Sequence, residues 1–188
     1  MSGNFSRTAV VRAIGVTIAL TLLVAGGARH AAAQTVPIEA FFGVWKGSGI
    51  ASSEGEYLDE SVRDLDVTIR GAAGGFSVDW TTVIRKGPSG DRKVERRDTT
   101  KTFRATGRPG LYQATDGGDF LKGEDLAWAR LDRQTLTIYR LVLNEAGEME
   151  LSRYDRTLPG GGMELEFSRQ RGSEVIRRVS GRLVKVGQ

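Results

Sequence analysis

The sequence predicts an all-β protein, a single antiparallel up-and-down β-barrel of about 8–10 strands with a short N-terminal helical turn. Three observations support this prediction. Glycine and proline divide the chain after residue 34 into short segments at regular intervals. These segments are rich in Val, Ile, Thr and aromatic residues, which favour strands. No segment after residue 34 has the periodicity of an amphipathic helix of three turns.

Ten segments between these breaks have the length and composition of strands, and Pro37 favours one helical turn before the first of them. We expect strands near 43–50, 60–70, 75–85, 93–104, 111–115, 125–131, 135–143, 148–157, 163–170 and 175–186. The chain shows no linker, low-complexity tract or clear internal repeat, so we expect these segments to form one domain.

The first 33 residues have the three parts of a secretory signal. Two arginines precede a nearly uncharged apolar run over 13–28, and Ala31–Ala33 supplies small residues at a cleavage site. This pattern predicts a cleavable signal peptide over 1–33, a mature domain over 34–188, and export to the periplasm or the medium. The alternative is an uncleaved N-terminal anchor, which Gly26 and Gly27 disfavour because they interrupt the apolar run.

Charge and composition exclude several classes of function. The chain has 27 Lys and Arg residues against 23 Asp and Glu residues, a net charge of +4. The leader holds three of the basic residues and no acidic one, which leaves a mature charge of +1. We therefore expect no nucleic-acid partner. The mature chain also has no apolar run that would form a transmembrane segment.

The chain has no cysteine, and its single histidine, His30, lies in the leader. Disulfides, thiolate or imidazole metal sites, and triads that use histidine are therefore excluded from the mature protein. The acidic, glycine-rich segment 116–125 does not match the spacing of a calcium loop, and we interpret it as an exposed loop. No cofactor and no metal are expected.

The alternation of side chains along each strand predicts which of them face inward. A turn at 71–74 places Leu65, Val67 and Ile69 opposite Trp80, Val78 and Phe76 on one apolar face. For the later strands, a turn near 133–134 pairs Trp128 with Tyr139. A two-residue turn at 145–146 then places Ser152 and Tyr154 on the same face as Tyr139, and a four-residue loop at 159–162 adds residues of the next strand to it. We name this set the aromatic face; its members are Trp128, Tyr139, Ser152, Tyr154, Met163, Leu165 and Phe167.

We expect the aromatic face to be interior because the opposite face carries Glu164 and Glu166, which are costly to bury. One bulge or one loop of odd length would reverse this assignment for the strands beyond it. The opposite face also carries Arg140 and Arg153, which are expected to be neighbours. If that face is inside, the two arginines would bind a carboxylate or phosphate; otherwise both are solvated.

The candidate ligand-binding residues are the aromatic side chains expected inside the barrel. A barrel of this size can hold one small ligand. The alternative is that the same rings simply fill the core. The candidates are Trp80, Trp128, Tyr139, Tyr154 and Phe167.

The start of the mature domain, Phe41-Phe42-Gly43-Val44-Trp45-Lys46-Gly47, resembles the calycin group of small barrels, which includes the lipocalins. The resemblance implies that Gly43 and Trp45 lie at the closed end of a lipocalin-like barrel, with a basic residue of the last strand over the tryptophan. Arg182 is the first candidate for that residue. Arg178 is the second, and we also count it among the ligand-binding candidates. The histidine of related haem-binding barrels is missing, so we carry over no haem.

These observations favour an exported small-molecule-binding barrel, with a small, largely apolar or hydrophobic molecule as its partner. The alternative is a structural or interaction protein of the cell envelope whose barrel is filled and binds no ligand. An enzyme would need carboxylates, Tyr, Lys or Arg in place of His and Cys, so binding is favoured over catalysis. An outer-membrane barrel is disfavoured because segments such as 95–98 place charges on both faces of a strand.

Overall fold

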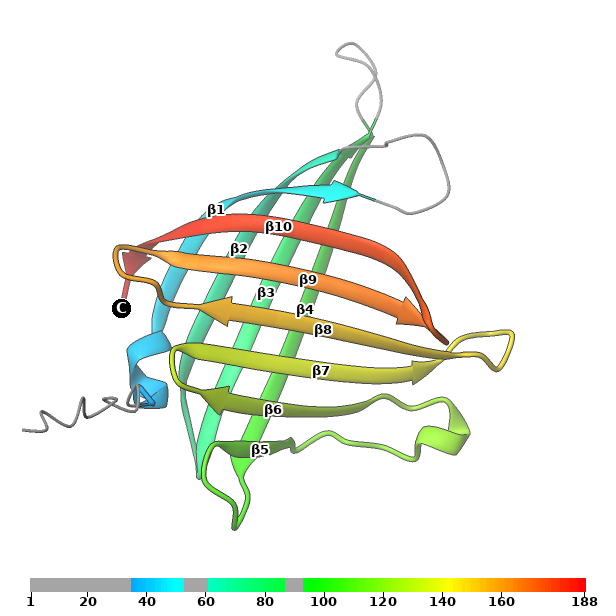
Figure 1. The fold of residues 1–188 in the computed structure, drawn as a ribbon, viewed down its shortest axis with the longest axis horizontal. Helices are drawn as coiled ribbons and strands as arrows, with labels where there is room; N and C mark the ends of the chain where they lie inside the picture. Colours follow the sequence, from blue (N-terminus) through cyan, green and yellow to red (C-terminus); the bar gives the residue numbers. More distant parts are fainter. Residues whose placement is uncertain (1–34, 53–60, 87–92) are drawn as a thin grey trace, which may run out of the picture. The chain divides into compact units, whose positions relative to one another are not determined.

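The computed structural model describes residues 35–52, 61–86 and 93–188, which form the closed antiparallel barrel predicted from the sequence (Figure 1). The expected signal peptide over 1–33 lies outside the described residues, so cleavage and export stay predictions. The regular structure of the described part consists of strands and two short 3-10 helices. None of its helices has the length and apolarity needed to span a membrane.

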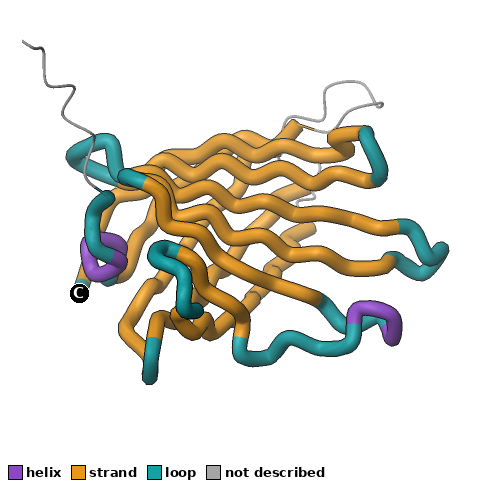
Figure 2. The backbone as a smooth tube through the Cα atoms, turned by 60° about the horizontal axis from the view of Figure 1, so that its bottom comes forward, coloured by secondary structure: helices purple, strands orange, loops and turns teal. Residues whose placement is uncertain are grey.

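Ten strands of the described chain form the barrel wall, and each is hydrogen-bonded to the next in sequence (Figure 2). The two 3-10 helices are η1 (Ile38–Phe41) and η2 (Phe120–Lys122). The strands are β1 (Gly43–Ser52), β2 (Ser61–Ala72), β3 (Gly75–Lys86), β4 (Lys93–Ala105), β5 (Leu111–Ala114), β6 (Leu126–Asp132), β7 (Thr135–Leu143), β8 (Met149–Thr157), β9 (Met163–Arg171) and β10 (Glu174–Gly187). Pairing of β1 with β10, from Val44 opposite Gly187 to Ser52 opposite Arg178, closes the barrel.

The hairpin of β2 and β3 has the predicted faces with a different register. Val67 lies opposite Trp80, where the sequence predicted Val78, because the turn consists of two residues, Ala73 and Gly74. A shift of two residues preserves the alternation, so the same side chains still point inward. Val67, Val78 and Trp80 are all buried in the core.

The predicted aromatic face is correct in its second half and wrong for Trp128 and Tyr139. These two residues do pair with each other, but Tyr139 lies opposite Arg153 instead of Ser152. The loop between β7 and β8 spans 144–148, an odd number of residues, and its Gly147 has a φ of 77°. An odd loop reverses the faces, so Trp128 and Tyr139 point outward whereas Tyr154 points inward.

One end of the barrel, which we call the closed end, is filled by η1 and the residues around Trp45. Phe41 is fully buried, and its carbonyl accepts a hydrogen bond of 2.9 Å from the indole N–H of Trp45. Gly43 has a φ of 134°, which side chains rarely adopt, and a β-carbon there would lie 2.3 Å from the Lys185 side chain. Gly43 and Trp45 thus lie beside η1 at this end of the barrel, and the closing role that the resemblance implies for them stays a prediction.

The basic residue over Trp45 is Lys185, and the prediction of Arg182 for that position is wrong. The Nζ of Lys185 lies 5.6 Å from the centre of the indole ring. A bulge between Val44 and Trp45 brings Trp45 opposite Lys185. Arg182 instead points outward, with 77% of its side chain exposed, and pairs with Glu164 at 2.9 Å.

The barrel wall is weakest beside β4. β5 is only four residues long and pairs with β4 only over Phe103–Ala105. Between 93 and 101, the described residues place no paired strand on this edge of β4. The chain over 115–125, which includes η2, runs along this side of the barrel instead (Figure 1). In this stretch, side-chain contacts such as those of Lys101 with Asp116 and Asp125 connect β4 to the segment 115–125.

Candidate functional site

A cavity of about 170 Å³ lies inside the barrel, between the filled closed end and the opposite end, which we call the distal end. Its wall combines apolar and aromatic side chains with six arginines, and no Asp or Glu is among the described residues that line it. The lining residues are Arg63, Leu65, Val67, Trp80, Thr81, Thr82, Arg97, Thr99, Arg140, Tyr154, Arg156, Leu165, Phe167, Arg169, Arg177 and Val179. This composition suits a ligand with both an apolar part and an acceptor of hydrogen bonds.

Three of the predicted ligand-binding aromatic residues line the cavity together. The ring centres of Trp80 and Tyr154 lie 5.3 Å apart, and those of Tyr154 and Phe167 lie 4.7 Å apart. These residues come from β3, β8 and β9, so the barrel brings together side chains that are distant in the sequence. Trp80 is only 9% exposed, and the three rings form a continuous aromatic wall.

Arg156, which the sequence analysis did not identify, lies fully buried at this wall with an exposure of 0%. Its Nε, Nη1 and Nη2 atoms find no hydrogen-bond partner among the described residues. The guanidinium carbon lies 5.5 Å from the Trp80 ring centre and 5.7 Å from that of Tyr154. Such cation–π contacts contribute about 2 kcal/mol when desolvated, whereas an uncompensated buried charge costs on the order of several kcal/mol.

Burial lowers the pKa of Arg156 to about 10, although the nearby Tyr154 and Asp155 act in the opposite direction. At neutral pH the group is therefore still a cation. A guanidinium offers five N–H donors in one plane, which suits a carboxylate or a phosphate. The deep part of the cavity thus presents a positive charge with unused donors.

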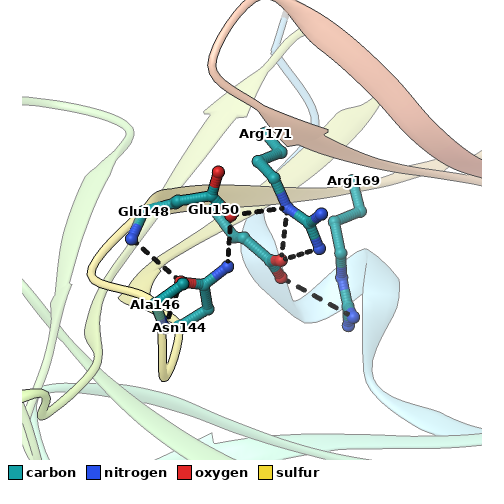
Figure 3. A network of polar contacts seen from close by, with 6 residues as sticks. All are labelled: Asn144, Ala146, Glu148, Glu150, Arg169 and Arg171. Atoms are coloured by element: carbon teal, nitrogen blue, oxygen red, sulfur yellow. Dashed lines mark hydrogen bonds and ion pairs between the residues drawn. The ribbon is translucent and has the colours of Figure 1, made fainter.

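Arginines nearer the distal end lie beside carboxylates. Arg97 donates to Glu95 at 2.6 Å on the same strand. Figure 3 shows Glu150 between Arg169 and Arg171, at 3.9 Å from the former and 2.7 Å from the latter. The hydrogen bond from Arg171 is the main reason that the pKa of Glu150 lies below its usual value. Much of the positive charge at this end is thereby balanced.

A partly buried ion-pair network joins β4 and β7 to Asp125, just before β6, across the weakly paired part of the wall. Asp125 accepts from Lys101 and from Arg140, with N–O distances of 3.0 and 2.5 Å. Lys101, which is 8% exposed in its side chain, also lies 2.8 Å from Asp116. Burial by itself would raise the pKa of Asp125, but the hydrogen bonds from Arg140 and Lys101 outweigh it and lower that pKa.

The other predicted ligand-binding residues lie on the outer wall. Trp128 and Tyr139 stack there with ring centres 4.9 Å apart, and the Arg153 guanidinium lies 6.0 Å from the Tyr139 ring centre. Arg140 points inward to Asp125, so the expectation that Arg140 and Arg153 share a face is wrong. Arg178 is exposed, because it alternates with the buried Val179.

The sequence does contain a pattern that indicates an inward position for Arg156 and Arg169. Arg156 lies two residues after Tyr154, and Arg169 lies two residues after Phe167, so each shares a strand face with a residue already predicted to be interior. Period-two alternation continued by one step would have placed both inside. A general expectation that arginine is solvated competes with that signal.

Among the described residues, no group of three acidic or histidine side chains gathers closely enough to hold a metal ion. Comparison with known proteins finds no matching family model and no matching curated protein. The search of solved structures finds matches of low similarity. The S-type phycobiliprotein lyase CPES from Guillardia theta is 10% identical, covering 80% of this chain and 90% of its own, with a TM-score of 0.41.

The protein Rv2717c from M. tuberculosis is 12% identical, covering 81% of this chain and 99% of its own, with a TM-score of 0.45. The acyl-CoA thioesterase II TesB2 from Mycobacterium marinum is 9% identical, covering 81% of this chain and 83% of its own, with a TM-score of 0.23. At these identities and TM-scores the likeness bears on no ligand or activity. The predicted lipocalin-like kinship stays a prediction, and the chain is a closed ten-stranded barrel.

Proposed function

We propose that this protein is an exported binding barrel for a small molecule about the size of one aromatic ring. The observation that carries the proposal is the cavity of about 170 Å³ with the aromatic wall of Trp80, Tyr154 and Phe167. A buried cavity of about 150 Å³ is enough to bind benzene. The volume is below the range of about 300–1,000 Å³ that is usual for drug-sized ligands, which favours a single ring.

The leading alternative is a structural or interaction protein of the cell envelope with a filled barrel. The closed end, where Phe41 and Trp45 are buried, agrees with that alternative in part. The cavity beside Arg156 supports binding instead, because a barrel that served only as a packed scaffold gains nothing from placing a cation with unused donors in its interior. The lining, which has aromatic rings and arginines but no carboxylate among the described residues, favours binding over acid–base catalysis.

The proposal is tested with the mature chain and three one-ring probes, neutral benzyl alcohol, anionic benzoate and cationic benzylamine. Calorimetry should detect saturable binding of at least one probe, and Trp80 fluorescence should change on binding. Val179→Phe fills the cavity from β10, since Val179 is 5% exposed and lines it, and should abolish binding. Val184→Phe is the matched control on the same strand, because Val184 is 55% exposed.

Saturable binding that Val179→Phe removes and Val184→Phe preserves supports the proposed function. If none of the three probes shows saturable binding to the folded protein, the proposed function is wrong and the filled-barrel alternative gains. Equal binding by both variants would also contradict it, because the probe would then be outside the cavity.

A further inference from the structure

We propose that the cavity contains an anion subsite at Arg156, so that its preferred ligand is a one-ring aromatic carboxylate or a similarly small organic anion. This inference rests on the proposed function and adds the chemical class of the ligand. It stands on the position of Arg156, the donors that its guanidinium leaves unused, and the balance of charge in the lining.

The position of Arg156 makes it the inner end of the cavity. Along β8 the inward-facing residues run from Glu150 near the distal end through Ser152 and Tyr154 to Arg156. Leu136 of β7 and Leu165 of β9 lie opposite Arg156, and both are buried. A ligand that enters from the distal end therefore meets the aromatic wall first and Arg156 last.

The two rings beside Arg156 leave its donors without a hydrogen-bond acceptor among the described residues. Trp80 and Tyr154 contact the guanidinium through cation–π interactions, at 5.5 and 5.7 Å from the ring centres. A cation–π contact is an attraction to the face of the ring and does not provide an oxygen acceptor for the N–H groups. A carboxylate can take two N–H donors side by side, the bidentate arrangement that guanidinium groups favour.

Charge balance distinguishes Arg156 from three of the other five arginines that line the cavity. Arg97, Arg140 and Arg169 each lie beside a carboxylate, namely Glu95, Asp125 and Glu150. Arg156 has no ion pair among the described residues, and the adjacent Asp155 side chain is engaged by Thr137 at 2.6 Å on the other face of the strand. A ligand carboxylate would therefore supply the counter-charge that the protein itself does not place there.

The size of the cavity limits what the anion can carry. With about 170 Å³ beside Trp80, Tyr154 and Phe167, one ring and one carboxylate fill the available space. Long-chain or multi-ring anions exceed it. This combination of one small ring and one negative charge differs from the largely apolar ligand that the sequence suggested, because the sequence analysis did not place Arg156 inside.

The test compares benzoate with benzyl alcohol and benzylamine on the wild-type protein and on two variants. Arg156→Met keeps the length and apolar stem of the side chain and removes the charge. Arg178→Met is the matched control, because Arg178 lies exposed on the outer face of β10. On the wild type, benzoate should bind at least about tenfold more tightly than benzyl alcohol, as expected for a charge-assisted hydrogen bond in a buried site, and benzylamine should bind least.

Arg156→Met should lose the preference for benzoate and retain binding of benzyl alcohol, whereas Arg178→Met should keep the wild-type order. Without ligand, the melting temperature of Arg156→Met should equal or exceed that of the wild type, because the variant removes an uncompensated buried charge. A merely structural arginine would give the opposite, a large loss of stability without a change in ligand preference.

A measurement on the wild type keeps the test decisive if Arg156→Met does not fold. The Arg156 Nε–H resonance, assigned by NMR, should shift on titration with benzoate and stay unchanged with benzyl alcohol. If benzyl alcohol binds and benzoate binds no more tightly, the anion subsite is wrong while the proposed function stands. If no probe binds, the proposed function fails, and the subsite fails with it.

Discussion

Replacing Asp125 with Asn should destabilise the barrel at neutral pH by about 2–3 kcal/mol. Removing one partner of a buried ion pair costs about 3–5 kcal/mol. Here the cost is reduced because Lys101 keeps Asp116 at 2.8 Å, and because Arg140, whose side chain is 36% exposed, can turn toward solvent. For a chain of this size, the melting temperature should fall by about 4–12 °C.

The effect of Asp125→Asn should shrink in acid. Burial by itself would raise the pKa of Asp125 in the folded state, but the contacts with Arg140 and Lys101 outweigh it and lower that pKa. The stabilisation is therefore complete above the unfolded pKa of about 3.9 and is lost as the pH falls through the lower folded pKa. As the pH falls through that lower folded pKa, the wild type approaches the variant, which has no carboxylate to protonate at this position.

Urea unfolding followed by circular dichroism, near neutral pH and at successively lower acidic pH values, measures both effects. Asp132→Asn is the control, because Asp132 pairs with Arg130 at 2.8 Å on the surface and is 46% exposed. That variant should change the free energy of unfolding by less than about 1 kcal/mol. The reasoning is refuted if the two variants are equally stable near neutral pH, or if the gap between Asp125→Asn and wild type persists in acid.

Three further substitutions test other parts of the structure. Gly47→Ala should lower stability by about 3 kcal/mol in thermal unfolding, because its β-carbon would lie 2.0 Å from a backbone oxygen of β10. Gly107→Ala is the control and should be neutral, because a β-carbon there would meet nothing within 4 Å. Equal melting temperatures of the two variants would contradict this packing. Phe41→Ala should lower the free energy of unfolding by about 3–5 kcal/mol, measured with urea, because the ring is fully buried at the closed end. A decrease below about 1 kcal/mol would mean that η1 does not fill that end. Trp128→Ala should leave the affinity for benzoate unchanged in calorimetry, whereas Trp80→Ala should weaken it; loss in the Trp128 variant would place that ring in the site.

Much of the fold could be predicted because frequent turns and period-two alternation survive small errors of register. The β2–β3 hairpin shows this, since Val67 moved from one partner to another without changing its face. The faces of β6 and β7 relative to the later strands could not be predicted with the same security. Their assignment depended on whether the loop at 144–148 has an even or odd number of residues, and composition does not determine that count.

The candidate site was predictable in its aromatic half only. Tyr154 and Phe167 were predicted to be inside because the opposite face of their strands carries Glu164 and Glu166, which are costly to bury. Arg156 shares the face of Tyr154, but the usual solvation of arginine argued against an interior position. The cation–π contact that stabilises Arg156 inside the barrel comes from Trp80 on β3, which is distant in the sequence. This contact can therefore be identified only in the folded barrel.

The edge of β4 between 93 and 101, with which no described strand pairs, explains the run of charged residues over 95–98. An unpaired strand edge offers backbone donors and acceptors to another chain and invites edge-to-edge association. Here the exposed stretch carries Arg96, Arg97 and Asp98, and the Arg96–Asp98 pair at 2.8 Å lies at the surface. A second strand docking on this edge would have to desolvate those charges. We therefore expect this run of mixed charges to oppose edge-to-edge association, even though each ion pair adds little to stability.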